Sequence, residues 1–449
     1  MSLTTGPILP TLLRLALPNV LAMAVSVLVS IAETRYVGLL GTAPLAAMAL
    51  VFPFAMLVQM MSSGAMGGGV SSAISRALGA GDAVRARTLA LHAVVIGVIG
   101  GVVTTIAFVG FGPALFRFLG GSGNVLAEAV RYSQVLFAGA ILIWLVNTFA
   151  SILRGTGDMR IPSTTLLAIA LLQIVLGGAL GLGLGPVPRL GMPGIAMGQI
   201  AATGAGVAFL LWWLVSGRAR LRLGRRGVAL RGEMFADILK VGALACLSPV
   251  QSVLTVLIFT GLIARLGVAP LAGYGIGQRL EFLLIPIAFG IGVASVPMVG
   301  MAIGAGDFAR ARRVAWTAGA VSAANLGAIG LTASLVPDLW AGLFSNDPVV
   351  LDYARQYLRW AGPGFALFGF GLTLYFASQG SGHVLGPVLA ATLRLVVVAG
   401  AGAWLASRNA PAWQLFALVG AAMVIYGLST GAAIRLTRWG PRPPAGAWR

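Results

Sequence analysis

Long apolar runs dominate the sequence from near its first residue almost to its last, and short polar or glycine-rich breaks separate them. A bilayer core about 30 Å thick requires roughly 20 apolar residues per helix. With only 9% charged residues, the chain leaves no room for a soluble domain between the runs. We therefore predict an all-α integral membrane protein whose twelve transmembrane helices lie at about 14–36, 45–76, 89–111, 131–153, 163–185, 194–216, 238–261, 270–303, 314–336, 356–378, 387–407 and 413–436.

Arginines gather in alternate loops and produce most of the net charge of +19. The positive-inside rule makes these loops cytoplasmic, which predicts a multi-pass protein of the inner (cytoplasmic) membrane with both termini inside. The most basic stretch is "GRARLRLGRRGVALRGEM" (217–234). Between hydrophobic spans such a stretch is expected to contact anionic lipid headgroups of the bilayer, and we expect no nucleic-acid partner.

An internal repeat divides the chain into halves. The stretch "LGAGDAVRAR" (78–87) returns as "IGAGDFARAR" (303–312), and "LGTAPLAAM" (40–48) returns as "LGVAPLAGY" (266–274). Because each copy holds an even number of spans, the repeats are parallel. They predict two six-helix lobes around a central cavity, with an N-terminal lobe at 1–217, a cytoplasmic linker at 218–237 and a C-terminal lobe at 238–449. In the repeated GAGD stretch, Asp82 and Asp307 are expected to cap the helix that follows.

Of the 11 acidic residues, only Glu33 and Glu281 fall within predicted spans, and an ionisable residue at membrane depth is a functional candidate by default. At about 100° per residue, Asn19, Ser26, Ser30 and Glu33 share one face of the first helix. A polar stripe of this kind must face protein or water. Burial there disfavours the charged form of Glu33, so protonation near neutral pH becomes feasible. The alternative is an interfacial carboxylate.

Other polar residues within spans are candidates for the cavity. Glu281, with Gln278 one turn before it, either holds its helix in a hydrogen-bond network or acts in transport directly, and Arg394 is expected to reach towards the cytoplasmic headgroups. Pro18 is either a hinge of the first helix or a static kink. The remaining cavity candidates are Gln59, Trp144, Asn147 and Ser151. The alternative to a cavity role for each of them is ordinary hydrogen bonding and packing between helices.

Five stretches together make the chain resemble the multidrug and toxic compound extrusion (MATE) transporters over nearly its full length. They are "LALPNVL" (15–21), "AETRYVGLLGTAPLAAM" (32–48), "SRALGAGDAVRAR" (75–87), "LRGTGDMRIP" (153–162) and "GQRLEFLLIPIAFGIGVA" (277–294). The resemblance is greatest to the DinF-type branch, in which the coupling site lies in the N-terminal lobe. It implies a twelve-helix, two-lobe transporter that alternates between outward-open and inward-open states and exports amphipathic, often cationic compounds in exchange for H⁺ or Na⁺.

The resemblance also assigns roles to residues. Glu33 stands where the family carries an acid in the first helix, and Pro18 stands at the family's proline upstream of it. In the fifth helix, where the branch carries an Asn and an Asp, this chain has Gln173 and Gly177, and in the sixth helix Gln199 replaces a common Thr. Losing one carboxylate favours H⁺ over Na⁺ as the coupling ion, with Glu33, Gln173 and Gln199 as the coupling residues.

The sequence thus predicts a drug-exporting antiporter with small-molecule, drug-like substrates, no cofactor beyond the coupling ion, no metal site, and a monomeric state. A lipid-linked saccharide flippase of the same superfamily is a second transport hypothesis, but it would need more cationic groups in its cavity. An enzyme is excluded because His92, His383 and Cys246 form no catalytic constellation with one another. Drug accumulation in cells separates these classes, since only an exporter lowers it.

Overall fold

The computed structural model describes residues 3–224 and 229–440, apart from the side chains at positions 26 and 27, and within these ranges the chain is helical without strands. Eleven helical stretches are long and apolar enough to cross a membrane. Helices α6 and α7, bent by 44° where they meet, complete a twelfth. The predicted fold class is confirmed. The helices are α1 (Ile8–Leu40), α2 (Thr42–Gln59), α3 (Gly67–Gly79), α4 (Ala83–Thr105), α5 (Phe111–Phe118), α6 (Gly123–Ala138), α7 (Ala140–Gly155), α8 (Arg160–Leu182), α9 (Met192–Val215), α10 (Gly232–Ala245), α11 (Leu247–Ala264), α12 (Val268–Gly304), α13 (Phe308–Leu335), α14 (Asp338–Ala341), α15 (Pro348–Ala361), α16 (Phe365–Ser381), α17 (Leu385–Ser407) and α18 (Ala412–Leu436).

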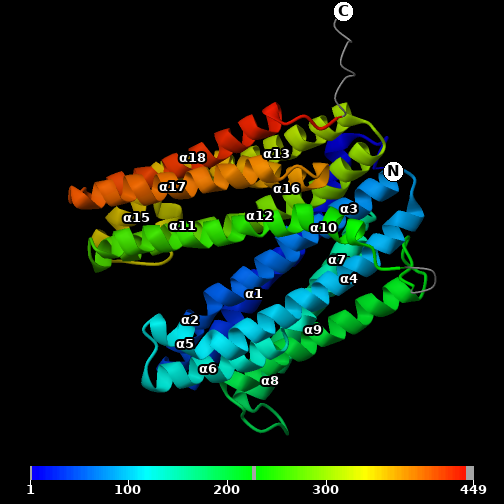
Figure 1. The fold of residues 1–449 in the computed structure, drawn as a ribbon. Helices are drawn as coiled ribbons and strands as arrows, with labels where there is room; N and C mark the ends of the chain where they lie inside the picture. The colour runs from blue at the N-terminus through cyan, green and yellow to red at the C-terminus, as the bar shows by residue number, and fades with distance from the viewer. Residues whose placement is uncertain (1–2, 225–228, 441–449) are drawn as a thin grey trace, which may run out of the picture. The chain divides into compact units, whose positions relative to one another are not determined.

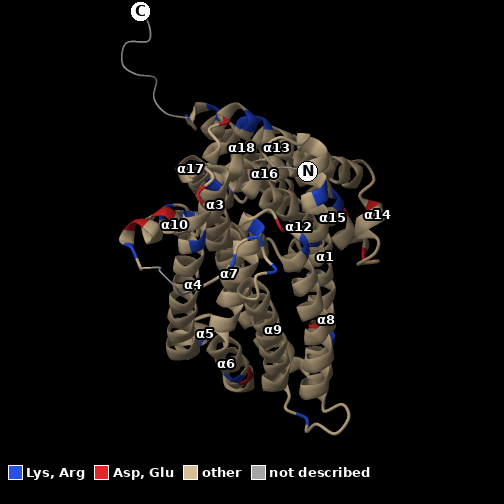
Figure 2. Cartoon of the chain, turned by 90° about the vertical axis from the view of Figure 1, so that its right-hand side faces the viewer, with Lys and Arg blue, Asp and Glu red and all other residues tan. Residues whose placement is uncertain are grey.

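Charged residues gather near helix ends and in the loops, and the long middle stretches of the helices are almost free of them (Figure 2). This distribution is the one that a membrane imposes, because a charge at bilayer depth is costly. Several helices extend beyond the apolar runs that predicted them. Helix α1 begins at Ile8 rather than at 14, and the seventh span begins with α10 at Gly232 rather than at 238. Polar and basic residues are tolerated at such ends, where water satisfies them.

The repeated GAGD motif forms the same structure twice. Asp82 accepts a hydrogen bond from the backbone N–H of Arg85 at 2.8 Å, and Asp307 accepts one from the backbone N–H of Arg310 at 2.8 Å. The glycine before each aspartate has a positive φ, as the turn requires. The predicted N-caps of α4 and α13 are therefore confirmed, and the motif is a turn and cap rather than a ligand loop.

Two of the spans contain π-helical turns, at Met60–Met66 between α2 and α3 and at Ile106–Gly110 between α4 and α5. A π turn widens the helix locally and breaks the regular alignment of side chains, and such turns occur often at functional sites. The first of them follows Gln59 directly. It therefore lies beside one of the residues that the sequence singled out.

The chain packs as two units (Figure 1). The N-terminal unit comprises Leu21–Ala77 and Asp82–Ala243, and the C-terminal unit comprises Met1–Val20, Leu78–Gly81 and Leu244–Arg449. The sequence placed its divisions at 217 and 237. By packing, α10 belongs to the N-terminal unit, and the first turns of α1 belong to the C-terminal unit. Two ion pairs explain why α10 belongs to the N-terminal unit, because the Asp237 carboxylate on α10 accepts hydrogen bonds from Arg76 at 2.7 Å and from Arg85 at 3.0 Å.

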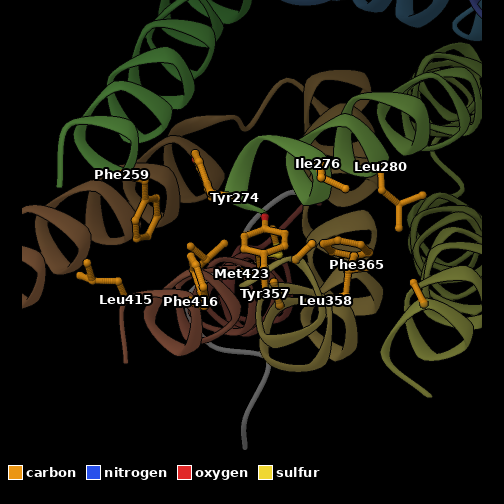
Figure 3. Close-up of a cluster of buried hydrophobic side chains, with 14 of the residues drawn as sticks. Phe259, Tyr274, Ile276, Leu280, Tyr357, Leu358, Phe365, Leu415, Phe416 and Met423 are labelled. Atoms are coloured by element: carbon orange, nitrogen blue, oxygen red, sulfur yellow. The ribbon is translucent and has the colours of Figure 1, made fainter. Parts of the chain in front are cut away.

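The core of the C-terminal unit is rich in aromatic side chains. Tyr357 of α15 is fully buried at its centre, and its ring meets those of Tyr274 and Phe416 edge to face at centroid distances of 5.4 Å and 5.5 Å. Figure 3 shows the Tyr357 ring among these side chains, with its hydroxyl directed at α12. Helices α11, α17 and α18 pack beside one another in the same unit. This unit can therefore hold polar side chains away from lipid.

Candidate functional site

Glu33 is buried inside the N-terminal unit. Its side chain lies on α1 with 7% of the residue's surface exposed, and its Oε1 atom accepts a hydrogen bond of 2.6 Å from Nε2 of Gln173 on α8. Tyr132 of α6 is also buried, within Coulombic range of the Glu33 carboxylate. The acid thus faces protein rather than lipid, and it forms no ion pair within the residues that the structure describes.

Close packing of α8 against α9 determines where Gln173 stands. A Cβ atom added to Gly198 of α9 would lie 2.4 Å from the backbone nitrogen of Gly177 on α8, so the two helices touch through their backbones. A Cβ atom added to Gly177 itself would meet nothing closer than 3.8 Å. Position 177 therefore has room for a Cβ atom, although this chain places none there.

Gln199 does not join the pair of Glu33 and Gln173. It lies half-buried on α9, its backbone carbonyl accepts from the Thr203 hydroxyl at 2.8 Å, and its amide makes no side-chain hydrogen bond in the described structure. Of the three predicted coupling residues, the structure brings together two. The role of Gln199 in coupling remains a prediction.

A second polar cluster lies at the π turn after α2. Nδ2 of Asn147, on α7, donates to Oε1 of Gln59 at 3.3 Å and to Oγ of Ser62 at 2.9 Å. The buried Oδ1 of Asn147 and Oγ of Ser151 have no hydrogen-bond partner in the described structure. Asn147 and Gln59, both predicted as cavity residues, are thus hydrogen-bonded to each other, and two buried polar atoms of the cluster are left without a partner in the described structure. Trp144, also predicted as a cavity residue, instead donates a hydrogen bond to the Thr104 hydroxyl at 3.0 Å.

The predicted stripe along α1 divides between the two units. Asn19 is buried and Pro18 half-buried in the C-terminal unit, whereas Ser30 and Glu33 belong to the N-terminal unit. The side chain of Ser26 lies outside the described residues. Helix α1 runs without interruption past Pro18, so the structure contains the proline inside a continuous helix.

Glu281 lies in the C-terminal unit with partners of its own. The Tyr357 hydroxyl donates a hydrogen bond to its Oε1 atom, and one turn earlier Nε2 of Gln278 donates to the Tyr274 hydroxyl at 2.8 Å. Of the two roles that the sequence left open, the network role has direct contacts to support it. The transport role of Glu281 remains a prediction.

The expected position of Arg394 was wrong. Arg394 is only 6% exposed, and its guanidinium lies over the rings of Tyr426 and Phe368 rather than reaching towards the headgroups. The cause is helical phase, because the face of α17 that carries Arg394 packs against α11 and α18. Arg279 of the same unit is exposed, and its guanidinium carbon lies 5.1 Å from the ring centroid of Phe344.

Sequence reasoning missed Ser62, Tyr274, Tyr357 and the pairing of Asp237 with two arginines. These are common residue types that no local motif marks, and their partners lie between 4 and 161 positions away in the chain. Glu281 and Asn147 were found because an acid and an amide are rare inside apolar spans. Their aromatic and hydroxyl partners are not rare there, so composition gave no signal.

The structure is thus a multi-pass helical membrane fold that buries isolated polar side chains. The family model described as MatE matches residues 18–178 and 245–405. These ranges make up more than half of the chain, which therefore belongs to the MatE family of transporters and is not an enzyme.

Curated proteins and solved structures give the same family. The chain is 25% identical over 358 residues to the FAD transporter of Shewanella oneidensis, covering 79% of this chain and 78% of the relative. It is 26% identical over 380 residues to the probable multidrug resistance protein NorM of Thermotoga maritima, covering 84% and 81%. A crystal structure described as MATE in the straight conformation superimposes with a TM-score of 0.89 at 25% identity, over 97% of both chains.

Proposed function

We propose that this protein is a secondary active multidrug efflux transporter that exports amphipathic, often cationic small molecules in exchange for H⁺. The observation that carries the proposal is the burial of Glu33 in the N-terminal unit with a single described hydrogen bond, from Gln173. A carboxylate desolvated in this way can exist with or without its proton, whereas an exposed carboxylate stays ionised at neutral pH. Membership of the MatE family and similarity to named multidrug proteins support an exporter.

The donors around Glu33 suit H⁺ better than Na⁺. A cation site requires several hard oxygen ligands, and Gln173 is the one side chain that the described structure hydrogen-bonds to the Glu33 carboxylate. Gly177 supplies no side-chain oxygen one turn further along α8. One carboxylate and one amide can hold and release a proton without further ligands.

Antiport follows if the proton and the cargo compete for this unit. Deprotonated Glu33 attracts a cationic cargo, and protonation from outside removes that attraction, so the cargo leaves. The proton and the cargo need only bind the two conformational states of the protein unequally for the exchange to be driven. A bend of α1 at Pro18 would couple the protonation of Glu33 to that change of state, because proline removes one helix hydrogen bond.

The cluster at the π turn is the best supported contact for cargo in the N-terminal unit. Asn147 and Ser151 each keep a buried polar atom without a partner in the described structure, and a polar group of the cargo would satisfy it. Trp144 on the same helix supplies an aromatic surface for an amphipathic molecule.

Proteoliposome transport with separately imposed gradients tests the proposal. We expect a pH gradient alone to drive uptake of a cationic dye by the wild type, and Glu33→Gln to lose this coupled transport because its amide cannot carry a proton. Glu33→Asp is the matched control, since it keeps the carboxylate and should retain pH-driven transport. Driving by Na⁺ alone would overturn the choice of ion, and full activity of Glu33→Gln would overturn the role of Glu33. FAD serves as a second cargo in the assay, because one relative is named as its transporter.

A further inference from the structure

The C-terminal unit contains a buried cation that the proposed coupling does not use. Arg394 lies on α17 with 6% of its surface exposed, and one of its terminal nitrogens donates to Oγ of Ser252 on α11 at 3.1 Å. Its guanidinium carbon lies 4.9 Å from the ring centroid of Tyr426 on α18 and 5.9 Å from that of Phe368 on α16. Four helices therefore enclose this one charge.

The hydrogen bonding of Arg394 is incomplete. Its buried Nε atom has no partner, and no carboxylate pairs with the guanidinium in the described part of the chain. Glu281 lies within Coulombic range, but its carboxylate already accepts from Tyr357. A buried charge without a paired anion is strongly unfavourable, so a guanidinium in this position is suited to receive one.

The neighbouring side chain of Gln251 also has a buried polar atom without a hydrogen-bond partner in the described structure. Gln251, one residue before Ser252 on α11, donates from Nε2 to the Thr392 hydroxyl at 2.7 Å, while its buried Oε1 has no partner in the described structure. The guanidinium can bind both oxygens of a carboxylate at once, and the free amide oxygen can accept from a hydroxyl or amine beside that carboxylate. The aromatic rings next to the guanidinium provide the apolar surface that ligand sites in proteins have.

We propose that Arg394, with Ser252, Gln251, Tyr426 and Phe368, forms a subsite for the carboxylate of an aromatic cargo. We name this set the Arg394 subsite. The inference rests on the proposed export function and extends its cargo from cations to compounds that carry a carboxylate together with an aromatic ring. The negative charge of Glu281 opposes such binding, so neutralising Glu281 should strengthen it.

A rhodamine dye and its methyl ester test the subsite, because the two molecules share the same fluorophore and differ only at the carboxylate. Binding is measured by fluorescence polarisation, with the whole protein in nanodiscs of phosphatidylcholine. We expect Arg394→Gln to weaken binding of the free acid about tenfold or more, as the loss of a charge-assisted hydrogen bond implies, and to leave binding of the ester unchanged. Glu281→Gln should bind the acid more tightly than the wild type.

Two further variants keep the test decisive. Arg394→Lys retains the charge without the planar fork, so we expect an acid affinity between those of the wild type and Arg394→Gln. Arg279→Gln removes an exposed arginine of the same unit and should change neither dye's binding. Equal weakening for acid and ester in Arg394→Gln would show a structural role and overturn the proposal, as would unchanged binding of both dyes.

The assay also shows whether the Arg394 subsite binds cargo or a lipid headgroup, and its result does not depend on the coupling mechanism. If phosphatidylglycerol in the nanodiscs abolishes the preference for the acid, the subsite binds a lipid headgroup, and the cargo assignment is wrong. Binding is measured without a gradient, so it does not depend on Glu33. Failure of Glu33→Gln to lose coupled transport would refute the coupling mechanism alone, while a lost acid preference in Arg394→Gln would still support the subsite.

Discussion

Replacing Gly198 with alanine should separate α8 from α9 and disturb the site at Glu33. The added Cβ would lie 2.4 Å from N and 2.6 Å from Cα of Gly177, and both are backbone atoms that cannot rotate away. Restoring ordinary contact requires the helices to move apart by about 1 Å. Overpacking of this kind costs about 1–3 kcal/mol, against a gain of up to about 1 kcal/mol from replacing glycine in a helix.

A displacement of α8 that carries Gln173 away from α1 would also break the hydrogen bond of Glu33. Gln173 lies on α8 one turn before Gly177, and its Nε2 atom stands 2.6 Å from the carboxylate. A movement of about 1 Å along that line gives a separation of about 3.6 Å, which is too long for a hydrogen bond. We therefore expect Gly198→Ala to lower both the apparent Tm in detergent and the rate of pH-driven transport.

Gly177→Ala is the control for this prediction because it adds the same methyl group to the same helix pair. Its Cβ meets nothing closer than 3.8 Å, so its Tm should equal or exceed that of the wild type. Thermal unfolding followed by size-exclusion chromatography measures both variants side by side. Equal Tm values for the two alanine variants would refute the reasoning, since the argument depends on their difference in space alone.

Two other substitutions test the packing of α10 and the choice of coupling ion. Asp237→Ala removes the carboxylate that accepts from Arg76 and Arg85, so we expect the stability to fall by about 1–3 kcal/mol. The control Glu128→Ala removes one partner of an exposed ion pair and should cost at most about 1 kcal/mol. Equal losses of Tm in the two variants would contradict this prediction. Gly177→Asp adds a carboxylate at a position where a Cβ atom meets nothing closer than 3.8 Å. We expect transport driven by a Na⁺ gradient to appear in this variant, and continued dependence on a pH gradient alone would refute the ligand argument.

The sequence by itself determined the spans and the isolated acids. Each span must be apolar enough to cross the bilayer on its own, so hydropathy locates it without knowledge of any partner. The caps at Asp82 and Asp307 were equally predictable, because an N-cap contacts a backbone group only three residues away. Glu33 could be selected because a carboxylate inside such a span requires an explanation.

Only the tertiary structure decided the partners of these residues. Gln173 lies 140 positions from Glu33, and it was nominated by family resemblance rather than by periodicity. The burial of Arg394 and the hydrogen bond between Tyr357 and Glu281 depend on how each helix is rotated against its neighbours. Rotation of an apolar helix is determined by side-chain packing over its whole length, and apolar residues on every face leave little periodicity from which to read it.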